Sequence, residues 1–255
     1  MTAPLLDERR GAVSLMLLNR PEVGNAVDLP MAEAIADALE RLDADPELRV
    51  GVLAGAGGGF CSGMDMKAFA RTGQWPFAGD RGFAGIARRS ARKPLIAAVE
   101  GYAIAGGLEI ALACDIIVAS RGAKLGLPEV KRGLVAAGGG LVRLARRLPA
   151  GIAAEMALSG DPITAERAHE LGAVNRLAEP GRALELALEL AGQVAANGPL
   201  AVAASKQILT RQRSWSEEEV FDRQDELARP VLESEDAAEG VRAYNEKRPP
   251  RWRSR

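Results

Sequence analysis

The segment AGGLEIALACD (residues 105–115) combines a carboxylate with glycines at the expected start of a helix. The two glycines come directly after an apparent strand, and Glu109 falls in the first helical turn. Glycines there let a ligand approach the backbone closely, and the free N–H groups of a helix start attract developing negative charge. The same pattern is typical of a tight strand-to-helix turn in which glycine only permits packing, so the segment alone leaves both interpretations open.

Two further segments contain groups that could work with Glu109. GGGFCSGMDMKAF (residues 57–69) follows another apparent strand and offers backbone donors around Met64. GLPEVKRG (residues 126–133) places Glu129 twenty positions after Glu109 and directly after Pro128, which fixes the backbone ahead of the carboxylate. Taken singly, the first is typical of a glycine-rich surface loop and the second of a solvated charge.

The single histidine, His169, and the two cysteines, Cys61 and Cys114, exclude several kinds of site. They cannot supply an HExxH or a mixed Cys/His zinc site, and His169 lies in the charged stretch AERAHELGAV, where a solvated helix face is expected. The sequence also lacks the phosphate-binding GxxxxGK[ST], the nucleophile elbow GxSxG and the dinucleotide-binding GxGxxG. Chemistry in this chain therefore has to use carboxylates and backbone dipoles, without a metal.

Short apolar runs that alternate with longer helical patterns must position these groups. The runs predict strands at residues 12–18, 50–54, 95–99 and 115–119, with lengths that suit a buried sheet. Helices are expected at residues 28–43, 105–114, 181–196, 200–211 and 217–232, the first with an Asp N-cap and a Pro in its first turn. The order predicts one α/β unit up to about residue 177, followed by a helical layer. Residues 72–90 fit a mobile lid and a packed loop equally well.

Composition narrows the class of protein further. The chain has 255 residues, of which 47% are hydrophobic and 26% charged, with a net charge of -1. This length can bury a sizeable core, and the charge balance gives no general attraction to nucleic acid or to an anionic membrane. No apolar run reaches the ~18–20 residues of a membrane span, and the charged N-terminal residues do not resemble a secretory signal. We therefore expect a cytoplasmic globular protein with reduced cysteines.

Six separated segments, in this order, resemble the enoyl-CoA hydratase/isomerase (crotonase) superfamily over almost the whole chain. They are NRPEVGNAV (residues 19–27), FCSGMDMKAF (60–69), KPLIAAVEGYAIAGGLEIALACDIIVAS (93–120), LGLPEVKRGLVAAGGGLVRL (125–144), ALSGDPITAERAHELGAVNRL (157–177) and EGVRAYNEKRPPRW (239–252). The resemblance implies an α/β fold, a crotonase-like spiral of ββα units with a helical C-terminal region. It also implies a spiral core over residues 1–195, a C-terminal helical trimerisation region over residues 196–255, and a homotrimer or dimer of trimers.

By the same resemblance, the chain is a hydro-lyase that adds water reversibly across the 2,3 double bond of an enoyl-CoA thioester. The thioester oxygen would accept hydrogen bonds from the backbone N–H groups of Met64 and Gly106, and losing one such donor costs about 10²–10³ in rate. Glu109 would position and deprotonate the water, and Glu129 would deliver the proton. Neighbouring carboxyls can divide these tasks because their pKa values are coupled. CoA is part of the substrate, and no other cofactor is implied.

The residues that match the family's contacts with CoA and substrate lie in several segments. They are Val23, Asn25, Ala26, Met64, Asp65, Met66, Lys67, Gly107, Ala137, Tyr244 and Lys247. Tyr244 and Lys247 match C-terminal contacts that often come from an adjacent chain, and Lys67 and Lys247 are candidate partners of CoA phosphates as well as ordinary solvated lysines.

Two departures from the family pattern concern the site itself. Ala105 stands where a glycine is frequent, and the pair Ala136-Ala137 replaces Pro-Gly. The N–H of Ala137 would help to hold the catalytic water, on a backbone that alanine restricts. We therefore expect Ala137 to affect how the water is placed.

Three other functions stay open beside simple hydration. The LPEVKRG context is similar to the carnitinyl-CoA dehydratase branch, which keeps both glutamates. A Δ3-Δ2 enoyl-CoA isomerase would use the same scaffold, and the Ala136-Ala137 change would suit a non-catalytic acyl-CoA-binding protein. The acyl chain length is open as well, because the large apolar side chains either line an acyl pocket or pack as core or lid. These side chains are Met64, Met66, Phe69, Trp75, Phe77 and Phe83.

Overall fold

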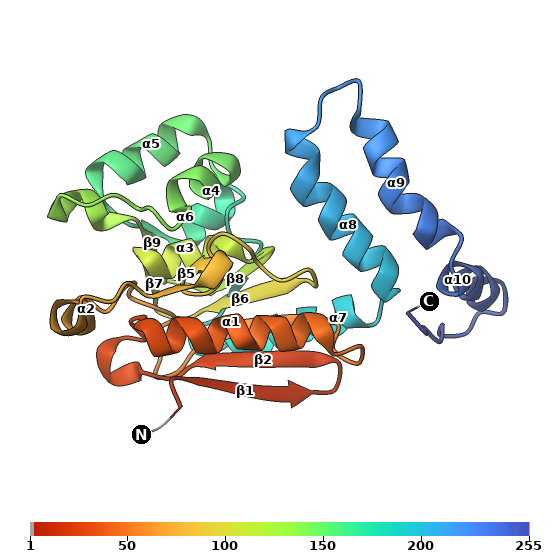
Figure 1. Cartoon of the computed structure of the whole chain (residues 1–255), viewed down its shortest axis with the longest axis horizontal. Helices are drawn as coiled ribbons and strands as arrows, with labels where there is room; N and C mark the ends of the chain where they lie inside the picture. Colours follow the sequence, from red (N-terminus) through yellow and green to blue (C-terminus); the bar gives the residue numbers. More distant parts are fainter. Residues whose placement is uncertain (1–2, 255) are drawn as a thin grey trace.

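A six-stranded sheet forms the centre of the computed structural model, which describes residues 3–254 (Figure 1). In spatial order its strands are β1 (Leu5–Arg10), β2 (Val13–Leu18), β3 (Val50–Gly55), β6 (Leu95–Val99), β8 (Ile116–Ser120) and β11 (Arg176–Ala178). β1 and β2 pair antiparallel, and all other neighbouring strands of this sheet are parallel. The four strands expected from the apolar runs are β2, β3, β6 and β8, each within one residue of its expected bounds.

Helices cover both faces of this sheet. On one face, Leu15 and Val52 pack in a cluster with α7 (Ala183–Ala195). On the other, Met16 and Leu53 belong to the larger core that includes α1 (Leu29–Ala44) and α3 (Gly106–Ala113). Because neither face meets water, the strands appear in the sequence as continuous apolar runs. The expected Asp N-cap of α1 is confirmed, because the Asp28 carboxylate accepts a hydrogen bond from the N–H of Met31 at 3.0 Å, a contact that typically stabilises by about 1 kcal/mol.

A three-stranded sheet adds the second layer of the spiral. Its order is β10 (Ile163–Thr164), β9 (Lys124–Gly126) and β7 (Tyr102–Ile104). β6 continues into β7 and α3, and β8 continues into β9 and then α4 (Gly140–Arg147). The bridge between Cys61 and Ala103 extends the same pattern to the turn that contains β3 and α2 (Met66–Thr72). The chain therefore repeats strand, strand and helix, which confirms the expected spiral of ββα units.

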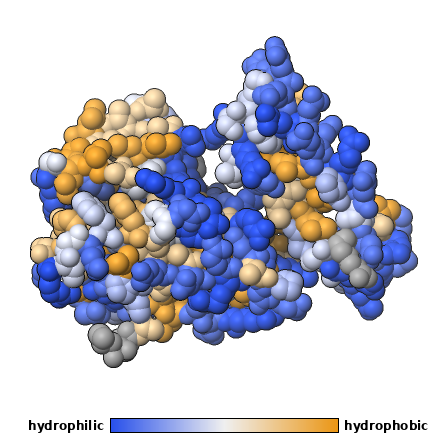
Figure 2. Space-filling view, viewed as in Figure 1, coloured by the Kyte–Doolittle hydropathy of each residue, from blue (hydrophilic) through white to orange (hydrophobic). Residues whose placement is uncertain are grey.

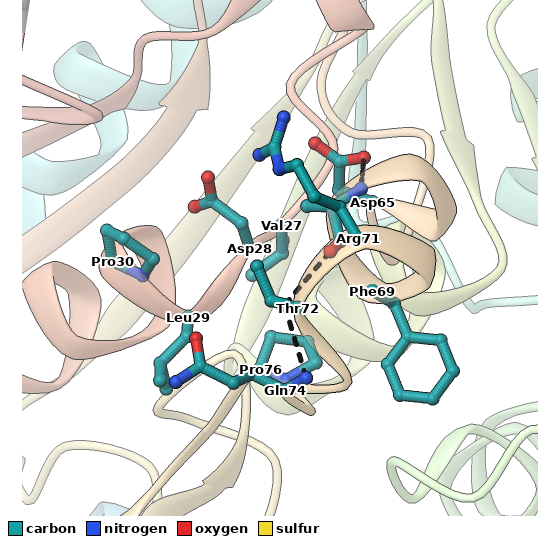
Figure 3. A pocket seen from close by; sticks show the side chains of 11 residues that line it. Val27, Asp28, Leu29, Pro30, Asp65, Phe69, Arg71, Thr72, Gln74 and Pro76 are labelled. Atoms are coloured by element: carbon teal, nitrogen blue, oxygen red, sulfur yellow. Dashed lines mark hydrogen bonds between the residues drawn. The ribbon is translucent and has the colours of Figure 1, made fainter.

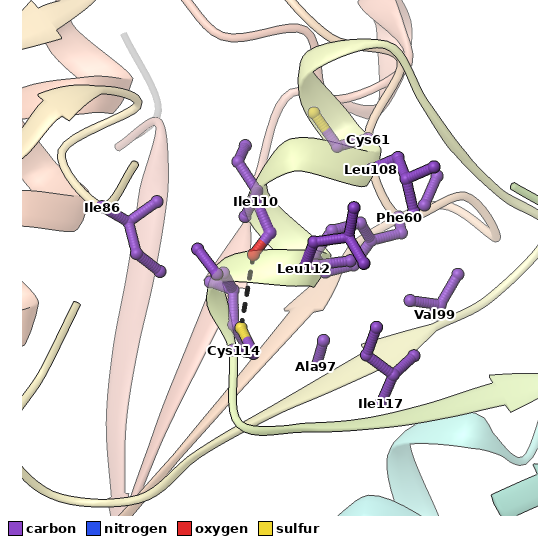
Figure 4. Close-up of a cluster of buried hydrophobic side chains, with 14 of the residues drawn as sticks. Phe60, Cys61, Ile86, Ala97, Val99, Leu108, Ile110, Leu112, Cys114 and Ile117 are labelled. Atoms are coloured by element: carbon purple, nitrogen blue, oxygen red, sulfur yellow. Dashed lines mark hydrogen bonds between the residues drawn. The ribbon is translucent and has the colours of Figure 1, made fainter. Parts of the chain in front are cut away.

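The helix α3 lies at the centre of the core. All eight of its residues are buried, and Figure 4 shows Leu108, Ile110 and Leu112 among apolar side chains from other elements. A helix in this position is fixed on every side, so it provides a rigid mount for any group that it carries.

Residues 72–90 form an anchored hairpin, which favours the packed loop over the mobile lid. β4 (Phe77–Ala78) pairs antiparallel with β5 (Gly82–Phe83). Between them, Arg81 is only 2% exposed and bonds the Glu40 carboxylate of α1 at 3.0 Å and 2.9 Å and the carbonyl of Arg89 at 2.7 Å. These contacts tie the hairpin to the core.

The remaining helices form a lobe beside the small sheet and a C-terminal arm. α5 (Ala150–Ser159) and α6 (Ala165–Glu170) belong to the lobe, and α8 (Pro199–Arg211), α9 (Val220–Leu232) and α10 (Glu235–Asn245) form the arm, which stands apart from the sheet in Figure 1. The base of the arm is held by Lys206, whose ammonium donates to Asp115 at 2.6 Å, and by Trp252, whose indole donates to the carbonyl of Ala196 at 2.8 Å. α8 and α9 were expected from sequence and α10 was not. The proposed boundary at residues 195/196 stays a prediction.

The structure also locates the residues used for exclusion. His169 is exposed on α6, as expected, with its Nδ1 atom 2.9 Å from the carbonyl of Val174. Cys61 and Cys114 are free, buried thiols, and within residues 3–254 no group of His, Cys, Asp and Glu side chains is arranged to hold a metal ion. In the same residues, no helix is long and apolar enough to cross a membrane. The cytoplasmic location stays a prediction.

Candidate active site

Two unpaired backbone N–H groups lie on neighbouring segments at the start of α3. The flanking residues of Met64 pair with Val27, because the N–H of Val27 donates to the Gly63 carbonyl at 2.8 Å and the N–H of Asp65 donates to the Val27 carbonyl at 2.9 Å. The N–H of Met64 itself therefore faces the opposite side. Gly106 is the first residue of α3, so its N–H has no acceptor within the helix.

The two segments approach each other as closely as backbones can. A Cβ placed on Gly63 would lie 3.0 Å from the nitrogen of Gly106, and one placed on Gly106 would lie 3.3 Å from the Cα of Gly63. Only glycine allows this approach. The structure thus brings together the predicted donors Met64 and Gly106, with the positive end of the α3 dipole behind them.

Glu109 lies one turn further along α3 and is 4% exposed. Its Oε1 atom accepts a hydrogen bond from the N–H of Gly140 at 2.8 Å. Burial raises the pKa of Glu109, and the nearby Glu129 charge adds to the rise. The N–H groups of Gly140 and Gly138 and the charge of Arg143 oppose it. These donors favour the ionised form and oppose the rise, so Glu109 is a desolvated carboxyl with hydrogen bonds directed to it.

Glu129 lies on the short 3-10 helix Pro128–Arg132 (η3), in which proline takes the first position as expected. Its Oε2 atom is buried and has no hydrogen-bond partner. Burial raises the pKa of Glu129, and a hydrogen bond from its own backbone N–H and the charge of Arg132 oppose the rise without reversing it. A buried carboxyl oxygen without a partner favours protonation or a bound ligand. The site therefore contains two carboxyls in different environments.

A glycine-rich loop before α4 encloses Glu109. A Cβ on Gly138 would lie 2.5 Å from the Oε2 atom of Glu109, and one on Gly140 would lie 3.0 Å from Oε1. Ala137 is exposed beside this loop and its φ is not positive, whereas Ala136 is buried in the core. Alanine at position 137 thus needs no left-handed conformation. Its predicted contact with the catalytic water stays a prediction.

Ala105 carries backbone strain directly before the Gly106 donor. Its φ is +54° and its ψ is -128°, a region that glycine tolerates and alanine rarely adopts. The surrounding hydrogen bonds hold Ala105 in this conformation. Its N–H donates to the carbonyl of Gly126 at 2.9 Å, and its own carbonyl accepts from the N–H groups of Leu108 and Glu109 at 2.9 Å and 3.1 Å. The strain fixes how α3 begins and how Gly106 presents its N–H.

Arg143 is a site residue that sequence reasoning missed. Its guanidinium donates to the carbonyl of Ala87 at 2.6 Å and to that of Gly138 at 3.4 Å. Arg143 is partly buried, which lowers the pKa of its guanidinium, and the Glu109 charge compensates in part. It therefore ties the glycine loop to the hairpin segment and adds a positive charge near Glu109. The signal in the sequence that could have pointed to Arg143 is its position about one helical turn after three consecutive glycines.

Three of the predicted CoA contacts are engaged with the protein itself. Asn25 is fully buried and donates to two backbone carbonyls of the neighbouring loop at 2.9 Å and 2.8 Å. The carbonyl of Ala26 and the carboxylate of Asp65 both bond Arg20, at 2.6 Å and 2.8 Å. Asp65 also caps α2 by accepting from the N–H of Ala68 at 2.9 Å. These contacts shape the loops, and the predicted contacts of Asn25, Ala26 and Asp65 with CoA stay predictions.

The other predicted contacts of this region differ in exposure. Val23, Met66 and Lys67 are exposed, on η1 (Pro21–Val23) and at the start of α2. Gly107 is buried and packs against the carbonyl of Cys61. A cavity of about 130 Å³ lies between α1 and α2, and Figure 3 shows the side chains that line it. Neither glutamate lines this cavity.

The structure does not bring the C-terminal candidates to this site within one chain. Tyr244 is 85% exposed on α10, and Lys247 follows that helix with a positive φ of +51°. α10 lies at the end of the arm, far from α2 and α3 (Figure 1). Contacts from these two residues to bound CoA would have to come from another copy of the chain.

The fold and the site define a class of protein. The family model "Enoyl-CoA hydratase/isomerase" matches residues 8–255, and the chain belongs to this family. It is 41% identical over 256 residues to the enoyl-CoA hydratase EchA19 of Mycobacterium tuberculosis, covering 98% of this chain and 96% of that protein. The carnitinyl-CoA dehydratase of Proteus mirabilis is 41% identical to it over 258 residues, covering 96% of this chain and 97% of that protein. The crystal structure of the enoyl-CoA hydratase EchA1 from Mycobacterium marinum superposes with a TM-score of 0.97 at 54% identity, covering 100% of both chains.

Proposed function

We propose that this protein is an enoyl-CoA hydratase, a hydro-lyase that adds water reversibly across the 2,3 double bond of an enoyl-CoA. The observation that carries the proposal is the pair Glu109 and Glu129, two desolvated carboxyls of raised pKa beside the free N–H groups of Met64 and Gly106. Hydration needs a base, an acid and a site for a developing enolate, and these residues supply one carboxyl for each of the first two tasks and two N–H donors for the third.

Each step can be assigned to a named group. The thioester oxygen accepts hydrogen bonds from the N–H groups of Met64 and Gly106, which stabilise the negative charge that develops when water attacks C3. Glu109 takes the proton of that water, since hydrogen bonds from Gly138 and Gly140 favour its charged form. Glu129 gives a proton to C2, since its partnerless oxygen favours the neutral acid. Dehydration of a 3-hydroxyacyl-CoA follows the same path in reverse.

Product analysis tests this assignment. A trans-2-enoyl-CoA incubated in heavy-oxygen water should yield a 3-hydroxyacyl-CoA that carries one heavy oxygen, detected by mass spectrometry. A 3-enoyl-CoA offered separately should not be converted faster than the 2-enoyl-CoA. Faster conversion of the 3-enoyl-CoA to its 2-isomer, without oxygen incorporation, would assign the chain to isomerisation and overturn the proposal.

Carnitinyl-CoA dehydration is a second candidate because the similar proteins include carnitinyl-CoA dehydratases. It uses the same glutamates and differs only in a trimethylammonium group on the acyl chain. Comparing kcat/KM for crotonyl-CoA with that for crotonobetainyl-CoA separates the two. A clear preference for the charged substrate would move the chain to the carnitinyl branch.

We also infer self-association, as a homotrimer or dimer of trimers, through the arm of residues 196–255. Exposed apolar side chains lie along it, including Leu209, Phe221 and Leu232, and Figure 2 shows apolar atoms on the arm. Single monomers rarely expose so many large apolar groups on one extension. Another copy would also supply Tyr244 and Lys247 to CoA, with Val23, Met66 and Lys67 on the same chain as the glutamates. Light scattering of the purified protein should give three or six times the mass of 26.9 kDa; a monomer would contradict the inference.

A further inference from the structure

Four aromatic side chains form a continuous row beside the site. The chain contains only five Phe and three Trp residues, and four of these eight are Phe69, Trp75, Phe77 and Phe83, which we call the aromatic row. The ring centroids of Phe69 and Trp75 are 4.5 Å apart, those of Trp75 and Phe77 5.9 Å, and those of Phe77 and Phe83 6.4 Å. Each ring therefore contacts the next.

Both ends of the row meet elements that carry the oxyanion donors. Phe83 is buried, and its ring fills the space beside Gly106, where a Cβ would overlap it. The same ring is close to the glycine loop, because a Cβ on Gly138 would lie 3.1 Å from it. At the other end, Phe69 belongs to α2, which begins two residues after Met64. The row thus connects the start of α3 with α2, close to both donor segments.

The middle of the row is exposed on a fixed support. Trp75 is 52% exposed and Phe77 is 50% exposed, although the intervening Pro76 is buried and its carbonyl accepts from the N–H of Ala84 at 2.9 Å. With Arg81 anchoring the hairpin, the backbone that carries these rings is fixed. Large apolar groups held in water next to a site are typical of a ligand surface.

We propose that the aromatic row is the acyl subsite and that it selects enoyl-CoA thioesters with a long or bulky hydrocarbon tail. This inference rests on the proposed function for the position of the thioester. With the thioester oxygen on C1 accepting from the Gly106 N–H, the acyl chain passes Phe83 and lies across Phe77 and Trp75. A four-carbon crotonyl group would end near Phe83 and leave the exposed rings in water, whereas a longer tail removes that apolar area from water.

The arrangement of the rings favours a hydrocarbon over the trimethylammonium group of carnitinyl-CoA. A cation is bound over the open faces of aromatic rings, but here successive rings pack on one another. Figure 3 shows Phe69 pointing away from the carboxylates of Asp28 and Asp65. Both of these carboxylates pair with Arg20, at 3.2 Å and 2.8 Å, and so are engaged with the protein itself.

Binding of saturated thioesters tests the proposal without depending on turnover. Dissociation constants for lauroyl-CoA, butyryl-CoA and 4-(trimethylammonio)butyryl-CoA are measured by calorimetry on the wild type, Trp75→Ala and Phe77→Ala. Leu158→Ala, which removes an exposed apolar side chain on α5, is the matched control. We expect lauroyl-CoA to bind at least about tenfold more tightly than butyryl-CoA. Each aromatic variant should lose about tenfold for lauroyl-CoA, or ~1.4 kcal/mol, while the control retains the preference.

Three results would overturn the inference: equal affinity for the long and short thioesters, a preference for lauroyl-CoA that survives both aromatic variants, or tightest binding of the trimethylammonium thioester. Circular dichroism of each variant establishes that it is folded. Because these ligands have no double bond, the result stands apart from the proposed function. A protein that binds lauroyl-CoA through the row and hydrates no enoyl-CoA would refute the hydratase and keep the subsite.

Discussion

The glycine loop before α4 makes Gly138→Ala a sharp test of how tightly the site holds Glu109. The new methyl group would lie 2.5 Å from the Oε2 atom and 2.9 Å from the Cδ atom of Glu109, and 3.1 Å from the ring of Phe83. A normal contact between two such atoms is about 1 Å longer than the shortest of these distances. Because the neighbours of Glu109 are buried and closely packed, its side chain has little room to move away. A misplacement of ~1 Å in a catalytic group costs on the order of 10²-fold in rate, which corresponds to about 2.7 kcal/mol. The backbone itself accepts alanine, since the φ of Gly138 is not positive.

The assay follows the loss of enoyl-thioester absorbance, and thermal unfolding is monitored by circular dichroism. We expect kcat/KM of Gly138→Ala to fall about 100-fold while the protein still unfolds cooperatively. Gly151→Ala is the matched control, because a Cβ there meets nothing within 4 Å and the residue lies within α5. This control should keep full activity and gain stability by about 0.5–1 kcal/mol. Wild-type kcat/KM in folded Gly138→Ala would refute the claim that Glu109 is sterically fixed.

Three other predictions follow from the charges and strain around the site. Arg143→Gln removes a cation that lowers the pKa of Glu109, so the acid limb of kcat/KM should move to higher pH, whereas an unchanged profile would separate Arg143 from the catalytic carboxylate. Ala105→Gly relieves the strain of a φ of +54°, which costs about 1–3 kcal/mol. The flexibility of glycine in the unfolded chain offsets about 0.5–1 kcal/mol of this gain in stability. Calorimetry should therefore show a rise in Tm of roughly 2–4 °C, with lower kcat as Gly106 loses its fixed position; a fall in Tm would argue against strain. Burial raises the pKa of Glu129 in the folded protein. The neutral carboxyl therefore stabilises the folded state relative to the ionised one, and this stabilisation is lost as the pH rises through the pKa of the folded state. Glu129→Gln should thus raise Tm at neutral pH and leave it unchanged below the ordinary glutamate pKa, and an equal effect at both pH values would contradict the sign of this shift.

The parts of the fold that could be predicted from sequence are those set by local chemistry or by burial on both faces. The strands β2, β3, β6 and β8 and the capped start of α1 at Asp28 are examples. β1 was missed because the segment LLDERR is an edge strand with one buried residue out of six, so its composition is that of a polar loop. The spiral arrangement of ββα units came from the family resemblance alone, and the spatial order of the strands was not predicted.

The residues of the candidate site also divide into those that could be predicted from sequence and those that could not. The two glutamates and the donors Met64 and Gly106 could be placed from motifs, and the structure brings their segments together. The roles of Arg81 and Arg143 could not. Their side chains bond groups tens of residues away, the Glu40 carboxylate and the Ala87 carbonyl respectively, and such contacts leave no local pattern. The conformations of Ala105 and Ala137 were also beyond sequence. Tertiary hydrogen bonds hold Ala105 at a positive φ, whereas the φ of Ala137 is not positive.

The central claim is that two carboxyls in different environments share one hydration reaction, and the turnover of single glutamine variants tests it most directly. Purified wild type, Glu109→Gln and Glu129→Gln are added to crotonyl-CoA and to dodec-2-enoyl-CoA, and the loss of absorbance is followed. We predict turnover by the wild type and a loss of at least about 10²-fold for each variant, within the range typical of general acid–base catalysis. Full activity of either variant on both substrates, in protein that remains folded, would contradict the paired-glutamate mechanism.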